Sequence, residues 1–234
     1  MKVKFCGITR PEDVRACAKV NADLIGFINI ERSKRFVSLD KINELTSLME
    51  NKKKAILVIE PEDLKEAETT IRKSAINTVQ LHSLSSEDII KLRHGFLMKQ
   101  DDELKMSLNI IKAIGIPETI TAPKRMEIEN FAMVSDFLLF DYEIDGKSGG
   151  TGRQIPLELA LEATKIAKNA NYDIKLFLAG GMNSEQIKNR VKLIDEIFDY
   201  IDINSGVEDQ PGLKNPEKIR ELMQIVKDIN DIQK

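Results

Sequence analysis

The 234-residue chain has few of the residues that disulfide frameworks and structural metal sites require. It contains two cysteines, Cys6 and Cys17, and two histidines, with no C-x-x-C pair and no mixed Cys/His spacing. Such a sequence supports neither a disulfide scaffold nor a structural zinc site. We therefore expect chemistry that proceeds without a metal.

Long runs of one kind of residue are also missing. The 35 basic and 38 acidic residues leave a net charge of -3, and no block of five or six like charges occurs, which argues against nucleic acid or a membrane surface as partner. The longest apolar stretches, such as FLLF before Asp141, are far shorter than a membrane span, and the first residues reach charged positions too early for a secretory signal. We expect a cytoplasmic protein that acts on a small molecule.

No linker rich in Pro, Gly or Ser divides the chain, so residues 1–234 are expected to form one domain. Short apolar runs, typical of strands buried on both faces, alternate with segments whose apolar residues recur at helical spacing. The runs span residues 3–8, 22–30, 55–60, 77–82, 109–116, 136–141, 174–180 and 200–204. Eight strand–helix units favour an α/β fold closed into a (β/α)8 barrel, the TIM-barrel architecture, and a doubly wound open sheet is the alternative. Residues 94–107 are expected to extend a helix and then form a loop.

Several of the intervening segments carry signals for the start of a helix. The pairs are Thr9 with Glu12, Asn183 with Gln186, and Asn215 with Pro216. Cys17 falls on an apolar stripe with Val14 and Ala18, so it is expected to pack in the core.

Polar residues follow the strands at their C-terminal ends, where a barrel of this kind carries its active site. They are Cys6, Ser33, Arg35, Gln80, His82, Asp141, Asp202 and Ser205. Each also has an ordinary structural explanation: Cys6 can pack as a small hydrophobic residue, Asp141 can cap a helix, His82 can be a satisfied core residue, and Arg35 can be a surface charge. Their convergence on one rim favours a functional site.

Glycine is concentrated in three loops after the last three strands: SGGTG (148–152), AGGMN (179–183) and NSG (204–206). Turn formation alone could explain them, because glycine supplies positive φ in tight connections. The last two loops of a barrel also form a recurring phosphate site. Neither G-x-G-x-x-G nor a Walker lysine occurs, so we expect a small phosphorylated substrate and no nucleotide cradle.

These motifs together resemble phosphoribosylanthranilate isomerase of tryptophan biosynthesis. The chain carries KFCGIT with PEDV, GFI before SKRFVS, VQLH, LLFD, GGTG, LAGGMN, and DINSGVE with PGLKNP, in the family's order over nearly its whole length. The resemblance implies a (β/α)8 fold and an Amadori rearrangement of N-(5-phosphoribosyl)anthranilate to 1-(2-carboxyphenylamino)-1-deoxyribulose 5-phosphate, without cofactor or metal.

The resemblance also implies a role for each matched residue. Cys6 matches the family's general base, Asp141 its general acid, and Arg35 the residue that holds the anthranilate carboxylate. The remaining matches are His82 and Asp202 lining the site, Gly180, Gly181, Ser205 and Gly206 in the phosphate loops, and Gly149 and Gly150 in a loop over the site. Cys6 must then react as a thiolate, although the reference pKa of a cysteine is ~8.5. We expect the N-terminus of the helix that follows to help lower the pKa of this thiol.

The chain departs from the family pattern at three places, none of which touches the acid/base pair. Ser83 and Leu84 follow VQLH where the family has glycine and an acidic residue, Lys34 replaces the proline of S-P-R, and residues 94–107 look longer than usual. We expect effects on loop geometry and substrate fit, with the reaction type retained.

Two other functions are compatible with a phosphate-binding barrel. The histidine-pathway isomerase performs the same rearrangement on a different phosphoribosyl amine, but that family uses aspartate where this chain has Cys6. A non-catalytic phosphate-binding barrel would be favoured by loss of Cys6 or Asp141, and both are present.

Overall fold

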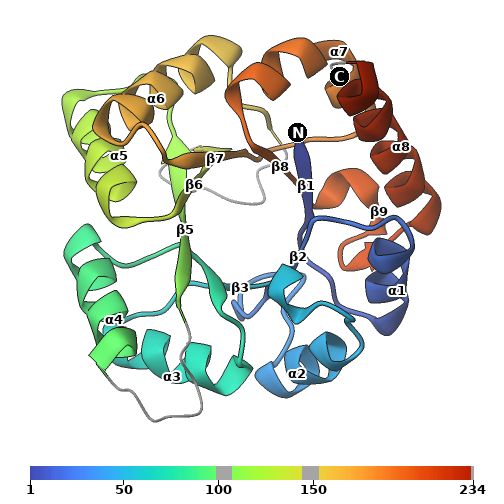
Figure 1. Cartoon of the computed structure of the whole chain (residues 1–234), viewed down its shortest axis with the longest axis horizontal. Helices are drawn as coiled ribbons and strands as arrows, with labels where there is room; N and C mark the ends of the chain where they lie inside the picture. Colours follow the sequence, from blue (N-terminus) through green and yellow to red (C-terminus); the bar gives the residue numbers. More distant parts are fainter. Residues whose placement is uncertain (99–106, 144–152, 233–234) are drawn as a thin grey trace.

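The structure, a computed structural model, describes residues 1–98, 107–143 and 153–232. Within these residues, eight parallel strands close into a barrel in the order β1 to β8, and helices surround it (Figure 1). Closure follows from the pairing of β1 with both β2 and β8, where Phe5 lies opposite Ile25 on one side and Ile203 on the other. The (β/α)8 prediction is therefore confirmed, and the open doubly wound sheet is excluded.

The barrel strands coincide with the apolar runs of the sequence. They are β1 (Lys2–Phe5), β2 (Leu24–Ile28), β3 (Ala55–Ile59), β4 (Thr78–Leu81), β5 (Asn109–Ile116), β6 (Phe137–Tyr142), β7 (Lys175–Leu178) and β8 (Tyr200–Ile203). The outer helices are α1 (Pro11–Lys19), α2 (Leu39–Ser47), α3 (Leu64–Ser74), α4 (Ser86–Met98), α5 (Ala122–Val134), α6 (Leu157–Ala170), α7 (Ser184–Ile197) and α8 (Pro216–Ile232). The predicted extension after residue 94 is helical as far as Met98, and residues 99–106 lie outside the described part of the chain.

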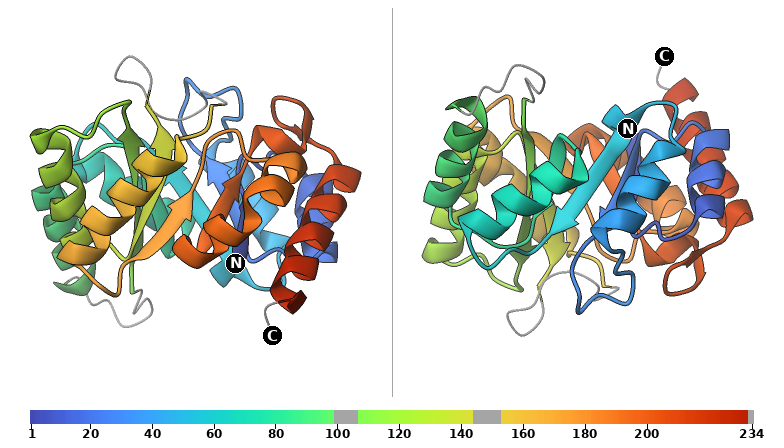
Figure 2. Two further views of the ribbon diagram at one scale, coloured as in Figure 1. Left: turned by 90° about the horizontal axis from the view of Figure 1, so that it is seen from above. Right: turned by 90° about the horizontal axis from the view of Figure 1, so that it is seen from below.

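Smaller elements complete the connections. The 3-10 turns are η1 (Lys52–Lys54) and η2 (Ser205–Val207). Directly after η2, β9 (Glu208–Gln210) and β10 (Leu213–Lys214) form a short antiparallel hairpin, which the sequence did not predict. Figure 2 shows this hairpin and the loop after β2 at the same end of the barrel.

Two of the three predicted helix starts are confirmed. The side chain of Asn183 accepts a hydrogen bond from the amide of Gln186 at 2.9 Å, and Asn215 caps α8 in the same way. The prediction for Thr9 was wrong, because α1 begins after Arg10 with a proline in its first turn. The hydroxyl of Thr9 donates to the carbonyl of Gly212 at 2.6 Å instead, since the hairpin packs against it.

The apolar core has two layers because side chains alternate across each strand. Val3 and Phe5 of β1 pack outward against the helices, and Cys6 belongs to the smaller cluster inside the barrel. Cys17 is fully buried in the outer layer, as predicted. Ala18 is exposed, contrary to the predicted stripe, and Ala16 is among the buried residues of α1 instead.

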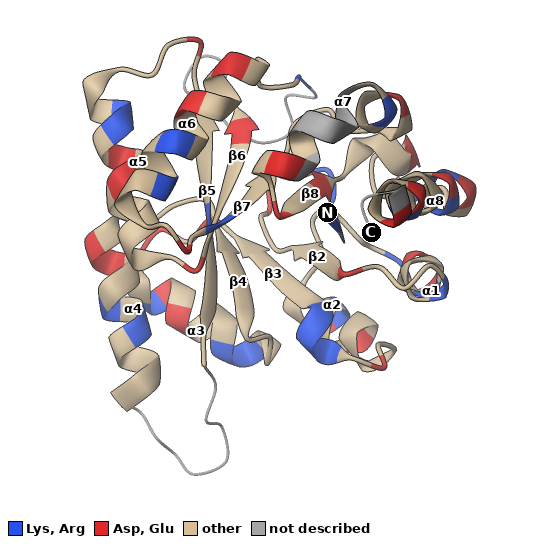
Figure 3. Ribbon diagram, turned by 45° about the horizontal axis from the view of Figure 1, so that its top comes forward, with Lys and Arg blue, Asp and Glu red and all other residues tan. Residues whose placement is uncertain are grey.

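Charged residues of both signs are spread over the outward faces of the helices, as expected for solvated surfaces (Figure 3). No helix in the described residues is long and apolar enough to cross a membrane.

Candidate active site

A cavity of about 380 Å³ opens where the strands end. It lies among most of the predicted site residues: Cys6, Arg35, His82, Asp141, Gly180, Gly181, Asp202 and Ser205. Gly206 is not part of the cavity wall, because its backbone packs against the carbonyl of Met182. Gly149 and Gly150 lie outside the described residues. The topology has thus gathered residues from both ends of the chain around one space.

Cys6 follows directly on β1 and faces the cavity. Its amide donates to the carbonyl of Ile203 at 2.8 Å, which holds the residue against the end of β8. Burial raises the pKa of the Cys6 thiol above its usual value, and the positive charges of Lys4 and Lys214 offset this effect only in part. Burial in the helical layer raises the pKa of the Cys17 thiol to about 12, although Lys214 acts to lower it; Cys6 has Lys4 as a second cation.

Lys4 is a site residue that the sequence analysis missed. It is fully buried on the inward face of β1, and its Nζ donates to Gln80 Oε1 at 2.8 Å and to both carboxylate oxygens of Asp202 at 3.0 Å. Burial lowers the pKa of Lys4, but Asp202 and Cys6 outweigh it and raise the pKa above its usual value. The signal was a lysine two positions before Cys6 in the otherwise apolar run of residues 3–8, because the period of two places both on one face.

His82 extends this polar group across the barrel. Its Nε2 lies 2.9 Å from Nε2 of Gln80, the residue that also accepts from Lys4. Burial lowers the pKa of His82 to about 4, with Lys4 and Lys112 adding to the effect against the opposing charge of Glu60. The ring is therefore neutral near neutral pH, and since the amide nitrogen of Gln80 donates to its Nε2, its Nδ1 carries the proton and can donate one hydrogen bond.

Asp141 lies near the end of β6 and is 8% exposed. Its Oδ1 accepts from the amide of Tyr142 at 2.8 Å. The alternative that it caps a helix is wrong, since α6 begins after Pro156. A Cβ on Gly180 would lie 2.8 Å from this carboxylate oxygen and 2.5 Å from the carbonyl of Arg153, so only glycine allows the loop after β7 to pass so close.

The loop after β7 has the geometry of an anion site. Gly180 and Gly181 both have positive φ, at +89° and +60°, and lead into α7, whose first turn is capped by Asn183. Their amide N–H groups donate to no acceptor among the described residues. Ser205 lines the same cavity from the loop after β8. Free N–H groups beside a helix N-terminus attract an anion.

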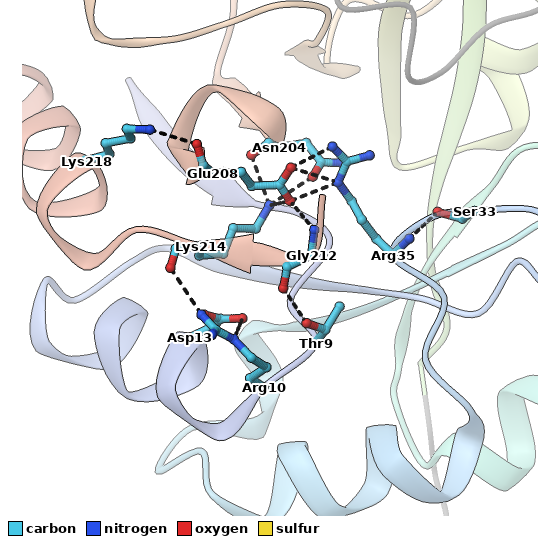
Figure 4. A network of polar contacts seen from close by, with 10 residues as sticks. All are labelled: Thr9, Arg10, Asp13, Ser33, Arg35, Asn204, Glu208, Gly212, Lys214 and Lys218. Atoms are coloured by element: carbon cyan, nitrogen blue, oxygen red, sulfur yellow. Dashed lines mark hydrogen bonds and ion pairs between the residues drawn. The ribbon is translucent and has the colours of Figure 1, made fainter. Parts of the chain in front are cut away.

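Arg35 is not the surface charge of the alternative explanation, because its side chain is 15% exposed. Figure 4 shows it paired with Glu208 of β9: Nε donates to Oε1 at 2.9 Å and Nη2 to Oε2 at 2.6 Å. Glu208 also accepts from Nζ of the buried Lys214 at 2.8 Å and from the amide of Gly212 at 3.1 Å. Burial favours the neutral acid, but Arg35 and Lys214 keep the pKa of Glu208 below its usual range.

Two of the departures from the family pattern lie in the loops after β2 and β4, at the end of the barrel that carries the cavity. Lys34 lines the cavity beside Arg35. Leu84 adopts positive φ, at +70°, and Lys112 supports the turn by donating to the carbonyl of Ser83 at 2.8 Å. In the described part of the chain, no group of three or more His, Cys, Asp or Glu side chains is placed to hold a metal ion.

Fold and site together define the class of protein: a (β/α)8-barrel enzyme whose cavity brings a thiol and a carboxyl group together beside a glycine-containing loop that leads into a helix N-terminus. Residues 3–225 match the model of the N-(5'-phosphoribosyl)anthranilate isomerase family. The chain belongs to this family.

Individual relatives agree with the family match. The chain is 34% identical over 228 residues to N-(5'-phosphoribosyl)anthranilate isomerase of Methanothermobacter marburgensis, covering 97% of this chain and 94% of that protein. It is 34% identical over 238 residues to the enzyme of the same name from Staphylococcus aureus, covering 99% of both chains.

Solved structures support the fold. The phosphoribosyl anthranilate isomerase of Thermus thermophilus has a TM-score of 0.76 at 23% identity, covering 98% of this chain and 100% of that one. A phosphoribosyl anthranilate isomerase in complex with reduced 1-(o-carboxyphenylamino)-1-deoxyribulose 5-phosphate has a TM-score of 0.73 at 22% identity, covering 97% of this chain and 99% of that one.

Proposed function

We propose that the chain is an aldose–ketose isomerase of tryptophan biosynthesis, which converts N-(5-phosphoribosyl)anthranilate to 1-(2-carboxyphenylamino)-1-deoxyribulose 5-phosphate with Cys6 as general base and Asp141 as general acid. The observation that carries this proposal is the family match over residues 3–225 together with the shared cavity of Cys6 and Asp141. An acid and a base on one substrate are what an Amadori rearrangement needs.

The reaction begins with one proton transfer from the acid and one to the base, and two further proton transfers complete it. The carboxylic acid of Asp141 gives its proton to the furanose ring oxygen, the bond from that oxygen to C1' breaks, and the lone pair of the anilino nitrogen forms an iminium ion. The thiolate of Cys6 then removes the proton from C2', which produces an enolamine. Protonation at C1' and loss of the proton from the C2' hydroxyl give the ketone, so the product has the same atoms as the substrate.

Substrate binding uses the two charged ends of the molecule. The phosphate is held by backbone N–H groups of the loops that contain Gly180, Gly181, Ser205 and Gly206, and the anthranilate carboxylate by Arg35. The analogue bound to the related isomerase carries a carboxyl group and a phosphate as well. A cavity of about 380 Å³ lies within the range of small-molecule sites. His82 and Asp202 contact the sugar between the two ends.

A cytoplasmic location belongs to the same proposal. Both cysteines are free thiols, which suits a reducing compartment. A thiol base needs that environment, because oxidation of Cys6 would remove the thiolate.

The test is an isomerase assay on the purified protein with phosphoribosylanthranilate generated in situ, in which the product is separated and quantified. We expect turnover well above the spontaneous decay of the substrate. Turnover only with the phosphoribosyl amine of histidine biosynthesis would support the alternative isomerase. Binding of the product analogue without turnover of either substrate would support a phosphate-binding barrel.

A further inference from the structure

We propose that Lys4 is a positioning residue for this reaction: its buried ammonium group stabilises the thiolate of Cys6, and Asp202 limits that effect by sharing the same positive charge. The inference rests on the proposed role of Cys6 as the base. It assigns a function to a side chain that lies beneath the cavity and outside its wall.

The first observation is the placement of the two side chains on β1. Lys4 is two residues before Cys6, so both point to the inside of the barrel. Both side chains lie over Gly26 of β2. A Cβ atom added to this glycine would lie 3.0 Å from Sγ of Cys6 and 3.1 Å from Cε of Lys4. The end of the Lys4 side chain and the sulfur of Cys6 therefore occupy the space that a side chain on residue 26 would fill, and glycine at that position leaves room for both.

The second observation is that the ammonium group of Lys4 is charged in the buried interior of the barrel, where a charge loses its hydration. It has no exposed surface, and its partners are Gln80 and the Asp202 carboxylate. A buried ion pair is often replaceable by apolar residues without loss of stability, so stability alone does not account for it. In the same low-dielectric surroundings, however, a positive charge acts strongly on a neighbouring sulfur.

The third observation is the balance of charges around the sulfur. Lys4 from β1, Lys214 from β10 and Arg35 from the loop after β2 favour the thiolate. Burial and Asp202 from β8 oppose it. Asp202 also keeps Lys4 protonated, because it raises the pKa of the ammonium. Lys4 is the strongest of the charges that favour the thiolate, so its removal shifts the balance most.

The experiment follows the ionisation of Cys6 directly, through the rate of alkylation by iodoacetamide as a function of pH. Cys17 is fully buried, so it should react far more slowly. Substitution Lys4→Met should raise the apparent pKa of Cys6 by about 1–3 units, because a charge at this range has that effect. The limb of the kcat/KM profile that reports the thiolate should move by the same amount. An unchanged alkylation profile would overturn the inference.

A second pair of variants keeps the test valid if Lys4→Met folds poorly, since that change leaves a buried carboxylate without its cation. The double variant Lys4→Met/Asp202→Asn removes both charges and should still raise the apparent pKa of Cys6, whereas Asp202→Asn alone should lower it. A double variant whose thiol titrates like the wild type would contradict the assignment.

Lys112→Met is the matched control for the loss of a buried lysine. Lys112 is 4% exposed on β5, but its Nζ lies over the ring of Phe131 of α5 at 4.6 Å, on the helical side of the barrel. Its alkylation profile should equal that of the wild type, and a shift as large as that of Lys4→Met would mean a general loss of packing. If Lys4→Met moves the alkylation profile but not the kcat/KM profile, Lys4 stabilises the thiolate and Cys6 is not the base.

Discussion

Burial alone does not distinguish Cys6, the proposed base, from Cys17, the cysteine expected to pack in the core. Cys6 is 4% exposed and Cys17 is fully buried, so both count as core residues. The difference lies in what surrounds each sulfur: Cys6 has Lys4 beside it and opens onto the cavity, while Cys17 packs among apolar residues of the helical layer. A cation and a path for the substrate are what a thiol base requires.

Replacing Cys6 with serine tests the base. We expect Cys6→Ser to lower kcat by roughly 10²–10⁴, because a hydroxyl hardly ionises near neutral pH, with little change in the thermal midpoint. Both quantities are measured on the same preparation. Cys17→Ser is the control and should lose stability while keeping its kcat, since it buries a hydroxyl far from the cavity. A stable Cys6→Ser protein with full activity would require another base.

Arg35 should contribute mainly to binding, because a guanidinium can pair with the anthranilate carboxylate in the ground state and in the transition state alike. We expect Arg35→Ala to raise KM by roughly 10- to 100-fold, the range of a charge-assisted hydrogen bond, and to change kcat less. Steady-state kinetics separate the two. If KM is unaffected, the pair of Arg35 with Glu208 is purely structural.

At the scale of elements, the loop between β7 and α7 combines an unusual backbone with the expected anion site. Gly181→Asp should abolish binding of a phosphorylated product analogue, because it places a negative charge where we propose that the phosphate binds. Gly181→Ala separates the charge from backbone strain, since it is strained at a φ of +60° but adds no charge. Ser205→Ala should be mild if the anion is bound through backbone. Calorimetric titration with the analogue measures all three, and unchanged affinity in Gly181→Asp would count against this site.

The hairpin of β9 and β10 holds the side chain of Arg35 in place through Glu208. Glu208→Gln removes the charge that orients the guanidinium, so we expect a several-fold higher KM and a similar kcat, together with a lower thermal midpoint because Lys214 stays buried with a weaker partner. Glu217→Gln on α8 is the matched control, since its pair with Arg220 is exposed and should matter little. Equal KM values for the two variants would show that Arg35 does not depend on Glu208.

At the scale of the whole molecule, His82 makes the free energy of unfolding depend on pH. Its pKa is lowered to about 4 in the folded protein, against about 6.5 when unfolded, so the unfolded chain binds more protons between these values. Stability should therefore fall as the pH decreases from about 6.5 to 4. Urea unfolding at pH 4.5 and 7.5 measures the loss, and His82→Asn should reduce it. An equal loss in both proteins would assign it to the carboxylates instead.

The architecture could be predicted from the sequence because its signals are local. Each barrel strand is a short apolar run bounded by polar residues, and the starts of α7 and α8 depend on side chains within three residues of the amides they cap. The position of Cys6 after the first strand and of Asp141 near the end of the sixth followed from counting strands. Once eight parallel strands close, all their C-terminal ends meet at one rim.

The tertiary structure decided what depends on residues far apart in the chain. Arg35 and Glu208 are 173 positions apart, and Lys4 is separated by 76 from Gln80 and by 198 from Asp202, so no periodicity relates them. Thr9 follows a local capping rule in the sequence, yet its hydroxyl bonds to the distant hairpin in the fold. The sequence by itself determined the strands and the residue types at their ends. Which charges face one another in the buried site was decided only by closure of the barrel, because the electrostatic energy of a charge depends on distances that the fold alone sets.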